Sequence, residues 1–272
     1  MPYELIVSQG RIADRTPGAL AGAALTAEAL SKSTGLVPTV FGEQSPACKD
    51  DWSVSLPEAR TTLTGLQGAI AATLRRGNKP LMVANTCSAS LASLPVVARH
   101  HPDAIVLWID AHGDFNTPET TESGYLGGMV LAAACGLWDS GHGSGLNPGQ
   151  VVIVGARDTD VPEADLMRQA GIRTLSPAEA TPEAILSAIG DKPVWIHVDW
   201  DALQPGNVPA AYAIASGLLP RQLNAIFGAI PAAQIAGIEL AEFEASGDAE
   251  KDAAALECLL DIVAPLTAVP PR

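Results

Sequence analysis

Ala104-Ile105-Val106-Leu107-Trp108-Ile109 leads directly into Asp110-Ala111-His112-Gly113-Asp114, and this stretch decides the fold. Its first part is a short apolar run rich in branched residues, which is typical of a parallel strand buried on both faces. Ionisable groups that follow such a strand lie at the carboxyl edge of the sheet, where open α/β proteins build their sites. Alternation along extended backbone places Asp110, His112 and Asp114 on one side. The stretch therefore predicts a strand that ends in a metal site.

The rest of the chain alternates between short apolar runs and helical patterns. Further strands are expected at residues 5–7, 37–41, 80–84, 151–154, 172–175, 193–198 and 235–240. Helices are expected from Pro17 to about residue 31 with Thr16 as the N-cap, and at residues 57–76, 89–100, 126–138, 163–170, 182–189, 220–230 and 251–263, with a loop at 42–56. This alternation predicts a three-layer αβα sandwich with a mostly parallel, twisted sheet. Because no internal repeat or linker interrupts it, we expect a single domain over residues 1–272.

Composition narrows the class of protein. The chain has 272 residues, of which 47% are hydrophobic and 4% aromatic, so it can bury a large, mainly aliphatic core. Its net charge of −14 argues against nucleic acid or an anionic membrane surface as a partner. The sequence has no apolar run of about 18 residues and no signal-peptide pattern. Its four cysteines form no CxxC pair, so we expect reduced thiols and a cytoplasmic location.

Polar clusters follow four of the expected strands. They contain Cys87; Asp110, His112 and Asp114; Asp158 and Asp160; and Asp199 and Asp201. One Asp-x-Asp pattern is commonly a turn or a helix cap, but two that each follow an apolar strand favour a shared site. Carboxylates gathered at one point repel each other unless cations lie between them. A carboxylate-rich set with one imidazole suits Mn²⁺, and two such ions would activate a water near neutral pH.

The two metal clusters resemble the motifs of a known family. Asp110-Ala111-His112-Gly113-Asp114 resembles the Asp-Ala-His-x-Asp signature of the arginase/agmatinase (ureohydrolase) family. Residues 198–205 resemble its second motif, with Gln204 where the family usually has Asp. The resemblance extends from about residue 80 to 245 and implies an arginase-like fold with two Mn²⁺ per chain. In this reading Asp110 and Asp199 bridge the metals, Asp114 binds one, and His112 and Asp201 bind the other.

The resemblance also implies a guanidino amino acid as the small-molecule substrate. Asn116, Thr121 and Ser123 fall in the family's arginase-type substrate loop, where Asn116 and Ser123 would bind an α-carboxylate. Asp160, with Glu163, would bind the α-amino group, and Glu242 would accept the guanidinium. Asp114 would take up a proton when the reaction intermediate collapses. This set of substrate residues argues against agmatine or another guanidino compound that lacks the amino-acid head.

Two positions depart from the family pattern. Cys87 stands where the family usually has a metal-binding His; it would bind as a thiolate, or it is a buried cysteine whose metal takes water instead. Gly127 stands where arginases carry a His thought to shuttle protons. Two other histidines are not expected to bind metal. His197 is expected to support the metal ligands or to contribute to packing, and His142 to lie in a solvated loop.

Without an imidazole at position 127, protonation of the leaving amine is harder, and a less basic N-hydroxyguanidine needs less of that help. In this respect the chain resembles the arginase relatives of antibiotic pathways, which hydrolyse Nω-hydroxy-L-arginine to hydroxyurea and L-ornithine. Two alternatives stay open: an arginase proper that gives urea and L-ornithine, and a degenerate ureohydrolase that binds without turnover. The resemblance also leaves a homo-oligomer open.

Overall fold

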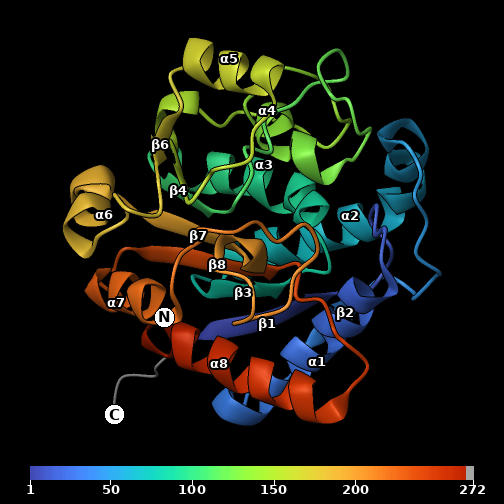
Figure 1. Ribbon diagram of the computed structural model, residues 1–272, viewed down its shortest axis with the longest axis vertical. Coiled ribbons are helices and arrows are strands. Elements are labelled where there is room, and N and C mark those ends of the chain that lie inside the picture. Colours follow the sequence, from blue (N-terminus) through green and yellow to red (C-terminus); the bar gives the residue numbers. More distant parts are fainter. Residues whose placement is uncertain (268–272) are drawn as a thin grey trace.

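The computed structural model describes residues 1–267. Its eight strands form one continuous parallel sheet (Figure 1). The strand order is β2-β1-β3-β8-β7-β4-β5-β6, and every neighbouring pair is parallel. The strands are β1 (Tyr3–Ser8), β2 (Thr39–Phe41), β3 (Lys79–Val83), β4 (Ile105–Ile109), β5 (Val151–Val154), β6 (Arg173–Leu175), β7 (Val194–Asp199) and β8 (Ile235–Ala241). The predicted domain, residues 1–272, includes residues 268–272, which lie outside the described part.

Helices cover both faces of the sheet, so the predicted three-layer αβα architecture is confirmed. The helices are α1 (Pro17–Thr34), α2 (Trp52–Arg75), α3 (Ser90–His100), α4 (Val130–Ala134), α5 (Val161–Ala170), α6 (Pro182–Ile189), α7 (Pro220–Ala229) and α8 (Ala249–Thr267). Short 3₁₀ turns lie at η1 (Cys87–Ala89), η2 (Gly127–Met129), η3 (Pro148–Gln150) and η4 (Trp200–Ala202). Helices α1, α6, α7 and α8 pack in one apolar core and α2, α3, α4 and α5 in the other.

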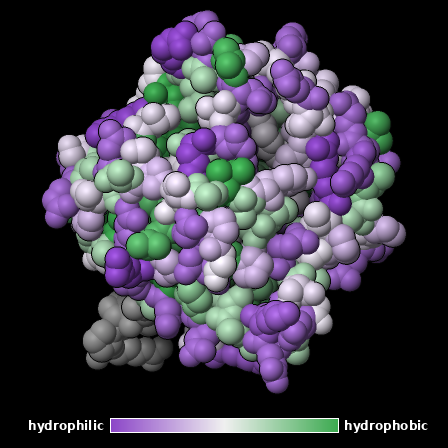
Figure 2. Space-filling model, viewed as in Figure 1, coloured by the Kyte–Doolittle hydropathy of each residue, from purple (hydrophilic) through white to green (hydrophobic). Residues whose placement is uncertain are grey.

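The alternation of side chains along each strand divides the core between the two faces. On β4, Leu107 and Ile109 belong to the α1/α8 side, whereas Val106 and Trp108 belong to the α2/α3 side. Every residue of β4 and β7 is buried, as expected for central parallel strands with helices on both faces. In the view of Figure 2, hydrophilic residues cover most of the surface, and hydrophobic residues form small separate areas. Among residues 1–267, no helix combines the length and the apolar character needed to cross a membrane.

Helix α2 begins earlier than the sequence predicts. It starts at Trp52 instead of Pro57, so the expected loop 42–56 is shorter. The Asp51 side chain caps the helix by accepting the Ser53 backbone N–H at 2.9 Å, and the Trp52 N–H donates to the Gly124 carbonyl at 2.8 Å. Proline ordinarily lies in the first turn of a helix. Here the stabilisation from the capped first turn exceeds the loss of the one backbone hydrogen bond that Pro57 cannot donate inside the helix.

Two smaller expectations, on helix α4 and on His142, were wrong. Helix α4 spans only Val130–Ala134 and not residues 126–138, because a 3₁₀ turn precedes it and Gly136 follows it with a φ of 81°. The predicted start of α1 is confirmed, because Thr16 occupies the N-cap and Pro17 the first helical position. The Thr16 side chain makes no cap hydrogen bond, and its hydroxyl donates to Glu244 at 2.6 Å. His142 is buried and not solvated, since its loop packs against the helical layer and its carbonyl accepts the Gln67 side chain at 2.9 Å.

Candidate metal centre and substrate pocket

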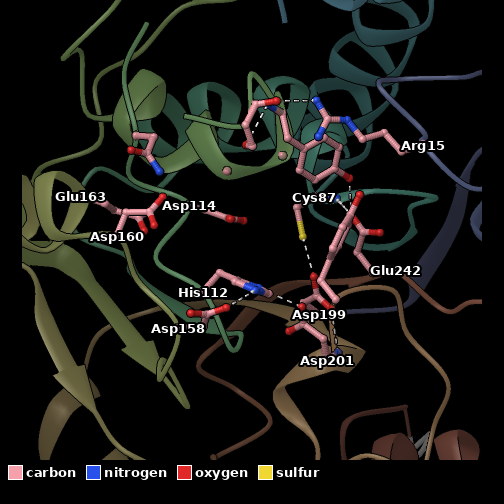
Figure 3. A pocket seen from close by; sticks show the side chains of 16 residues that line it. Arg15, Cys87, His112, Asp114, Asp158, Asp160, Glu163, Asp199, Asp201 and Glu242 are labelled. Atoms are coloured by element: carbon pink, nitrogen blue, oxygen red, sulfur yellow. Dashed lines mark hydrogen bonds and ion pairs between the residues drawn. The ribbon is translucent and has the colours of Figure 1, made fainter. Parts of the chain in front are cut away.

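The predicted ligands meet at the carboxyl edge of the sheet, because the strands that carry them are neighbours in the order β3-β8-β7-β4-β5. Cys87 follows β3, Glu242 follows β8, Asp201 follows β7 and His112 follows β4. Their side chains point into one cavity (Figure 3). The cavity is lined by Arg15, Cys87, His112, Asp114, Asn116, Ser123, Tyr125, Gly127, Gly128, Asp158, Asp160, Glu163, Asp199, Asp201, Tyr212 and Glu242.

Backbone N–H groups of the turns after β4 and β7 hold the carboxylates in place. The His112 N–H donates to Asp110 Oδ1 at 2.7 Å, and the Trp108 indole N–H donates to Asp110 Oδ2 at 3.0 Å. The Ala111 N–H donates across the strands to Asp201 Oδ1 at 3.0 Å. The Asp201 N–H in turn donates to Asp199 Oδ1 at 2.8 Å. In both the Asp-x-His and the Asp-x-Asp pattern, the backbone N–H of the second potential ligand therefore donates to the carboxylate of the first and fixes its orientation.

One potential ligand group contains Asp110, His112 and Asp201. His112 Nδ1 lies 2.9 Å from Asp201 Oδ2 and 3.3 Å from Asp110 Oδ1. Burial lowers the pKa of His112, but hydrogen bonds and charges from these two carboxylates outweigh burial and raise it to about 12. His112 Nδ1 thus faces two carboxylate oxygens at the point where a divalent cation would bind the same three residues.

A second potential group contains Cys87, Asp199 and Glu242. Cys87 Sγ lies 3.1 Å from Asp199 Oδ2 and 4.0 Å from Asp110 Oδ2. Burial raises the pKa of the Cys87 thiol well above its usual value, and the surrounding carboxylates add to this effect. Without a cation the sulfur is therefore a neutral thiol, and ionisation requires a positive charge at this point.

Asp114 provides an independent indication of a bound cation. Its Oδ2 is buried and has no hydrogen-bond partner among residues 1–267, although the backbone adopts a left-handed φ of 49° to aim the side chain inward. Burial, followed by the charge of Asp110, raises the pKa of Asp114 well above its usual value, and burial and Asp201 do the same for Asp199. Carboxylates that repel each other in a dry cavity fit a divalent cation, so the donor set suits the predicted metal.

Glu242 lies in the wall of the cavity, next to Cys87 and Asp199. It too adopts a left-handed φ, of 65°, and it is 4% exposed. Its Oε1 accepts the Cys87 N–H at 3.0 Å and the Tyr125 hydroxyl at 3.0 Å. Burial raises the pKa of Glu242 to about 8 despite these two hydrogen bonds. A buried carboxylate held by only one of its oxygens is suited to accept a cationic or multi-donor group in the cavity.

The predicted substrate residues lie farther out. Asn116 and Glu163 are buried, and Glu163 accepts the Phe115 N–H at 2.8 Å; burial raises its pKa to about 7. Ser123 and Asp160 are exposed at the rim. Thr121, in contrast, is not among the lining residues, and its hydroxyl accepts the Gly124 N–H at 3.1 Å within the loop.

The lining residues Arg15, Tyr125 and Tyr212 are among those to which the sequence assigned no role. The Arg15 guanidinium donates to the Ser123 carbonyl at 2.9 Å and lies 4.7 Å from the centre of the Tyr125 ring. Arg15 follows β1, whose carboxyl end belongs to the same edge of the sheet, and that topology was the available signal. For the two tyrosines no sequence signal gives the direction of the ring.

A parallel sheet with a carboxylate-rich cation site at its carboxyl edge defines a class of metal-dependent α/β enzyme. The model of the arginase family matches residues 1–263, and the chain belongs to this family, whose members are metal-dependent hydrolases. The chain is 56% identical over 262 residues to N(omega)-hydroxy-L-arginine amidinohydrolase of Streptomyces lavendulae, with 96% of each chain covered. It is 30% identical over 194 residues to arginase of Bacillus caldovelox, covering 65% of this chain and 64% of the relative.

Solved structures show the same fold. Arginase from Bacillus cereus superposes with a TM-score of 0.84 at 23% identity, and the match covers 100% of both chains. The family resemblance and the arginase-like fold that the sequence predicted are therefore confirmed.

Proposed function

We propose that this protein is a binuclear-manganese amidinohydrolase that converts Nω-hydroxy-L-arginine and water to hydroxyurea and L-ornithine. The observation that carries the proposal is the 56% identity, over 96% of both chains, to a protein named for that substrate. The cavity supports it, because one cavity is lined by the candidate cation ligands, by the buried carboxylate Glu242 and by the exposed polar residues Ser123 and Asp160.

The family resemblance gives the proposed metal ligands, and the geometry of the cluster supports them. Asp110 and Asp199 would bridge two Mn²⁺ ions, Cys87 and Asp114 would complete one site, and His112 and Asp201 the other. The short distances from Cys87 Sγ to Asp199 and from His112 Nδ1 to Asp201 support this division. When bound, the two ions supply a water that loses its proton near neutral pH.

The substrate would lie with its N-hydroxyguanidine at the floor and its amino-acid head at the mouth. Glu242 Oε2 would accept N–H groups of the guanidine, since Oε1 already accepts two hydrogen bonds. Asn116 and Ser123 would bind the α-carboxylate, and Asp160 with Glu163 the α-amino group. Thr121 does not line the cavity, and its hydroxyl, which accepts the Gly124 N–H, would instead help to hold this loop. Arg15 adds a positive charge next to Ser123, which favours a substrate that carries a carboxylate.

Proton transfer would depend on Asp114. Its Oδ2 is buried and without a partner, so it is positioned to take a proton from the attacking water and to deliver it to the departing ornithine nitrogen. No imidazole at position 127 assists this step. An N-hydroxyguanidine is less basic than a guanidine and reaches a neutral, attackable form more readily. The missing His therefore favours the hydroxylated substrate.

A substrate panel tests the proposal. Purified protein with added Mn²⁺ is offered Nω-hydroxy-L-arginine, L-arginine and agmatine, and release of ornithine or putrescine is measured. We expect kcat/KM for Nω-hydroxy-L-arginine to exceed that for L-arginine at least a hundredfold. Glu242→Gln is the control, because it keeps the shape of the site but removes the charge that holds the guanidine.

Two other outcomes would replace this proposal. A preference for L-arginine would identify an arginase proper. Fewer than two Mn²⁺ per chain, together with no ornithine release from any substrate, would identify a degenerate ureohydrolase that binds without turnover.

We further infer a cytoplasmic enzyme of antibiotic biosynthesis that has no nucleic-acid or membrane partner. The acidic charge and the likeness to hydroxyurea-forming relatives support this inference. A homo-oligomer stays open and is settled by light scattering of the purified chain.

A further inference from the structure

A row of fully buried residues lies one step beneath the proposed metal ligands. Trp108 on β4, His197 on β7 and Glu239 on β8 are direct register partners across three neighbouring strands. Each has no exposed surface. Trp108 precedes the ligand Asp110 by two residues, and His197 precedes Asp199 by two, so the row lies on the same face of the sheet as the metal cluster.

His197 is held from three directions. Its ring stacks on that of Trp108, with centroids 3.5 Å apart and planes 4° apart. Its Nδ1 lies 3.4 Å from the Ser90 hydroxyl and 3.5 Å from Glu239 Oε2. Its Nε2 lies 3.4 Å from Cys87 Sγ, so the free end of the ring points at the sulfur.

Glu239 is itself fixed by helix α3. Its Oε1 accepts the Ser90 hydroxyl at 2.8 Å, and its Oε2 accepts the Ser93 hydroxyl at 2.9 Å. Burying a carboxylate and an imidazole at zero exposure is unfavourable unless both are hydrogen-bonded, so an apolar pair would serve mere packing better. The arrangement therefore indicates that these two polar groups act on what His197 contacts, which is Cys87.

We propose that His197, backed by Glu239, is the positioning residue for the Cys87 sulfur, so that a carboxylate–imidazole–sulfur chain leads into the metal centre. A single proton bridges Nε2 and Sγ whichever atom carries it, and this hydrogen bond keeps the side chain of Cys87 directed at Asp199 and the cavity. Metal-binding residues commonly depend on such a hydrogen-bonding partner for their orientation. Position 87 thus carries no imidazole of its own, but the imidazole of His197 on β7 contacts the Cys87 sulfur from the side away from the cavity. The inference rests on Cys87 being a metal ligand, as proposed above.

Cobalt substitution tests this chain of contacts. In Co²⁺-loaded protein a sulfur ligand produces a thiolate-to-cobalt absorption band, and titration of the metal-free protein gives the metal affinity. We expect His197→Phe, which keeps the stack on Trp108 but removes both nitrogens, to weaken the band and to lower the affinity about 10–100-fold. Glu239→Gln, which keeps the shape and the serine contacts, should shift the affinity in the same direction by a smaller factor. It serves as the second variant if His197→Phe does not fold.

Two controls separate positioning from a general loss of structure. In a Cys87→Ala background, His197→Phe should have no further effect on affinity, because the sulfur through which it acts is gone. His142→Phe, at another buried histidine remote from the ligands, should leave the band unchanged.

Three outcomes would overturn the proposal. One is a wild-type band and affinity in His197→Phe, and another is an equal effect of that change with and without Cys87. A wild-type cobalt protein without the band would remove Cys87 as a ligand and this inference with it, whereas ornithine release would still decide the hydrolase function separately.

Discussion

At position 127 the wall of the pocket has no side chain, and the ring of Tyr125 occupies the adjacent space. A Cβ built on Gly127 would lie 2.5 Å from Tyr125 Cε1, closer than real contacts allow. The Tyr125 hydroxyl is at the same time hydrogen-bonded to Glu242. The Tyr125 ring therefore occupies the space that a side chain at position 127 would need.

This coupling predicts the outcome of restoring the histidine. Gly127→His alone should destabilise the fold by about 1–3 kcal/mol through overpacking. Tyr125→Ala combined with Gly127→His should recover part of that loss, because the ring that blocks position 127 is removed. Thermal unfolding of the wild type, Gly127→His, Tyr125→Ala and the double variant measures both effects. An unchanged melting temperature in Gly127→His would show that Tyr125 moves aside without cost.

A second prediction concerns Asp14, a buried carboxylate outside the metal cluster. It accepts the Ile12 N–H at 2.7 Å and the Asn85 side chain, but its Oδ1 is buried and unpaired among the described residues. Burial raises its pKa from 3.8 to about 6. A raised carboxyl pKa means that the folded state holds the proton more tightly, so its stabilisation is complete below pH 3.8 and is lost as the pH rises through 6.

The loss amounts to about 3 kcal/mol by the usual conversion of pKa shift to free energy. The Asp14→Asn variant cannot ionise at this position, so it should not show this loss of folding stability as the pH rises. We expect the melting temperature of the variant, relative to wild type and in metal-free buffer, to increase steadily from pH 4 to pH 7. A pH-independent difference between the two proteins would show that Asp14 is not the group that titrates.

At the scale of elements, Arg157 connects the end of β5 to the loop that follows η4. Its guanidinium donates to the carbonyls of Asp201 at 2.8 Å, Ile214 at 2.7 Å and Ala215 at 3.0 Å, and it also contacts Gly155, Ala202 and Leu203. The loop it holds carries Tyr212 into the wall of the pocket. One side chain therefore fixes a loop that has little regular structure of its own.

Arg157→Lys should loosen this loop while keeping the charge. The planar guanidinium of arginine donates to several carbonyls in different directions, whereas the single ammonium group of lysine cannot reach all of them. We expect KM for the proposed substrate to rise about tenfold and limited proteolysis to become faster between residues 203 and 219, with the Mn²⁺ content unchanged. Arg168→Lys, at an exposed arginine paired only with Asp165, is the matched control. Equal KM values for both variants would contradict the assignment.

At the scale of the whole molecule, the cation site links two halves of the sheet. Its carboxylates come from β4 and β7, its thiol follows β3, and burial keeps several of their pKa values high. Metal that binds the folded state but not the unfolded chain adds stability in proportion to the logarithm of its concentration.

Removal of metal with a chelator should therefore lower the melting temperature, and Mn²⁺ should restore it. At a hundredfold excess over Kd the gain is about 2.7 kcal/mol per site. Asp199→Asn, which removes the charge of a proposed metal ligand, should abolish most of the Mn²⁺-dependent increase. A melting temperature insensitive to Mn²⁺ in wild-type protein would contradict a metal centre of this kind.

The sequence by itself determined the sheet, its helical covering and the position of the ligands. Apolar runs such as 104–109, in alternation with helical patterns, predict buried parallel strands, and the residue that follows each such strand lies at the carboxyl edge of the sheet. Asp110, Asp199 and Cys87 were therefore placed by local pattern alone. Helix starts were less certain, as Asp51 and Pro57 show, because a cap and a proline compete for the same role.

Only the tertiary structure decided what lies between and behind these residues. The clash between Tyr125 and position 127, the approach of Arg15 to Ser123 and the row of Trp108, His197 and Glu239 all join residues far apart in the chain. Such contacts depend on strand order and side-chain rotamers, and neither leaves a periodic signal in the sequence. The sequence thus shows which groups carry the chemistry, whereas the packing of neighbouring strands shows how each group is held.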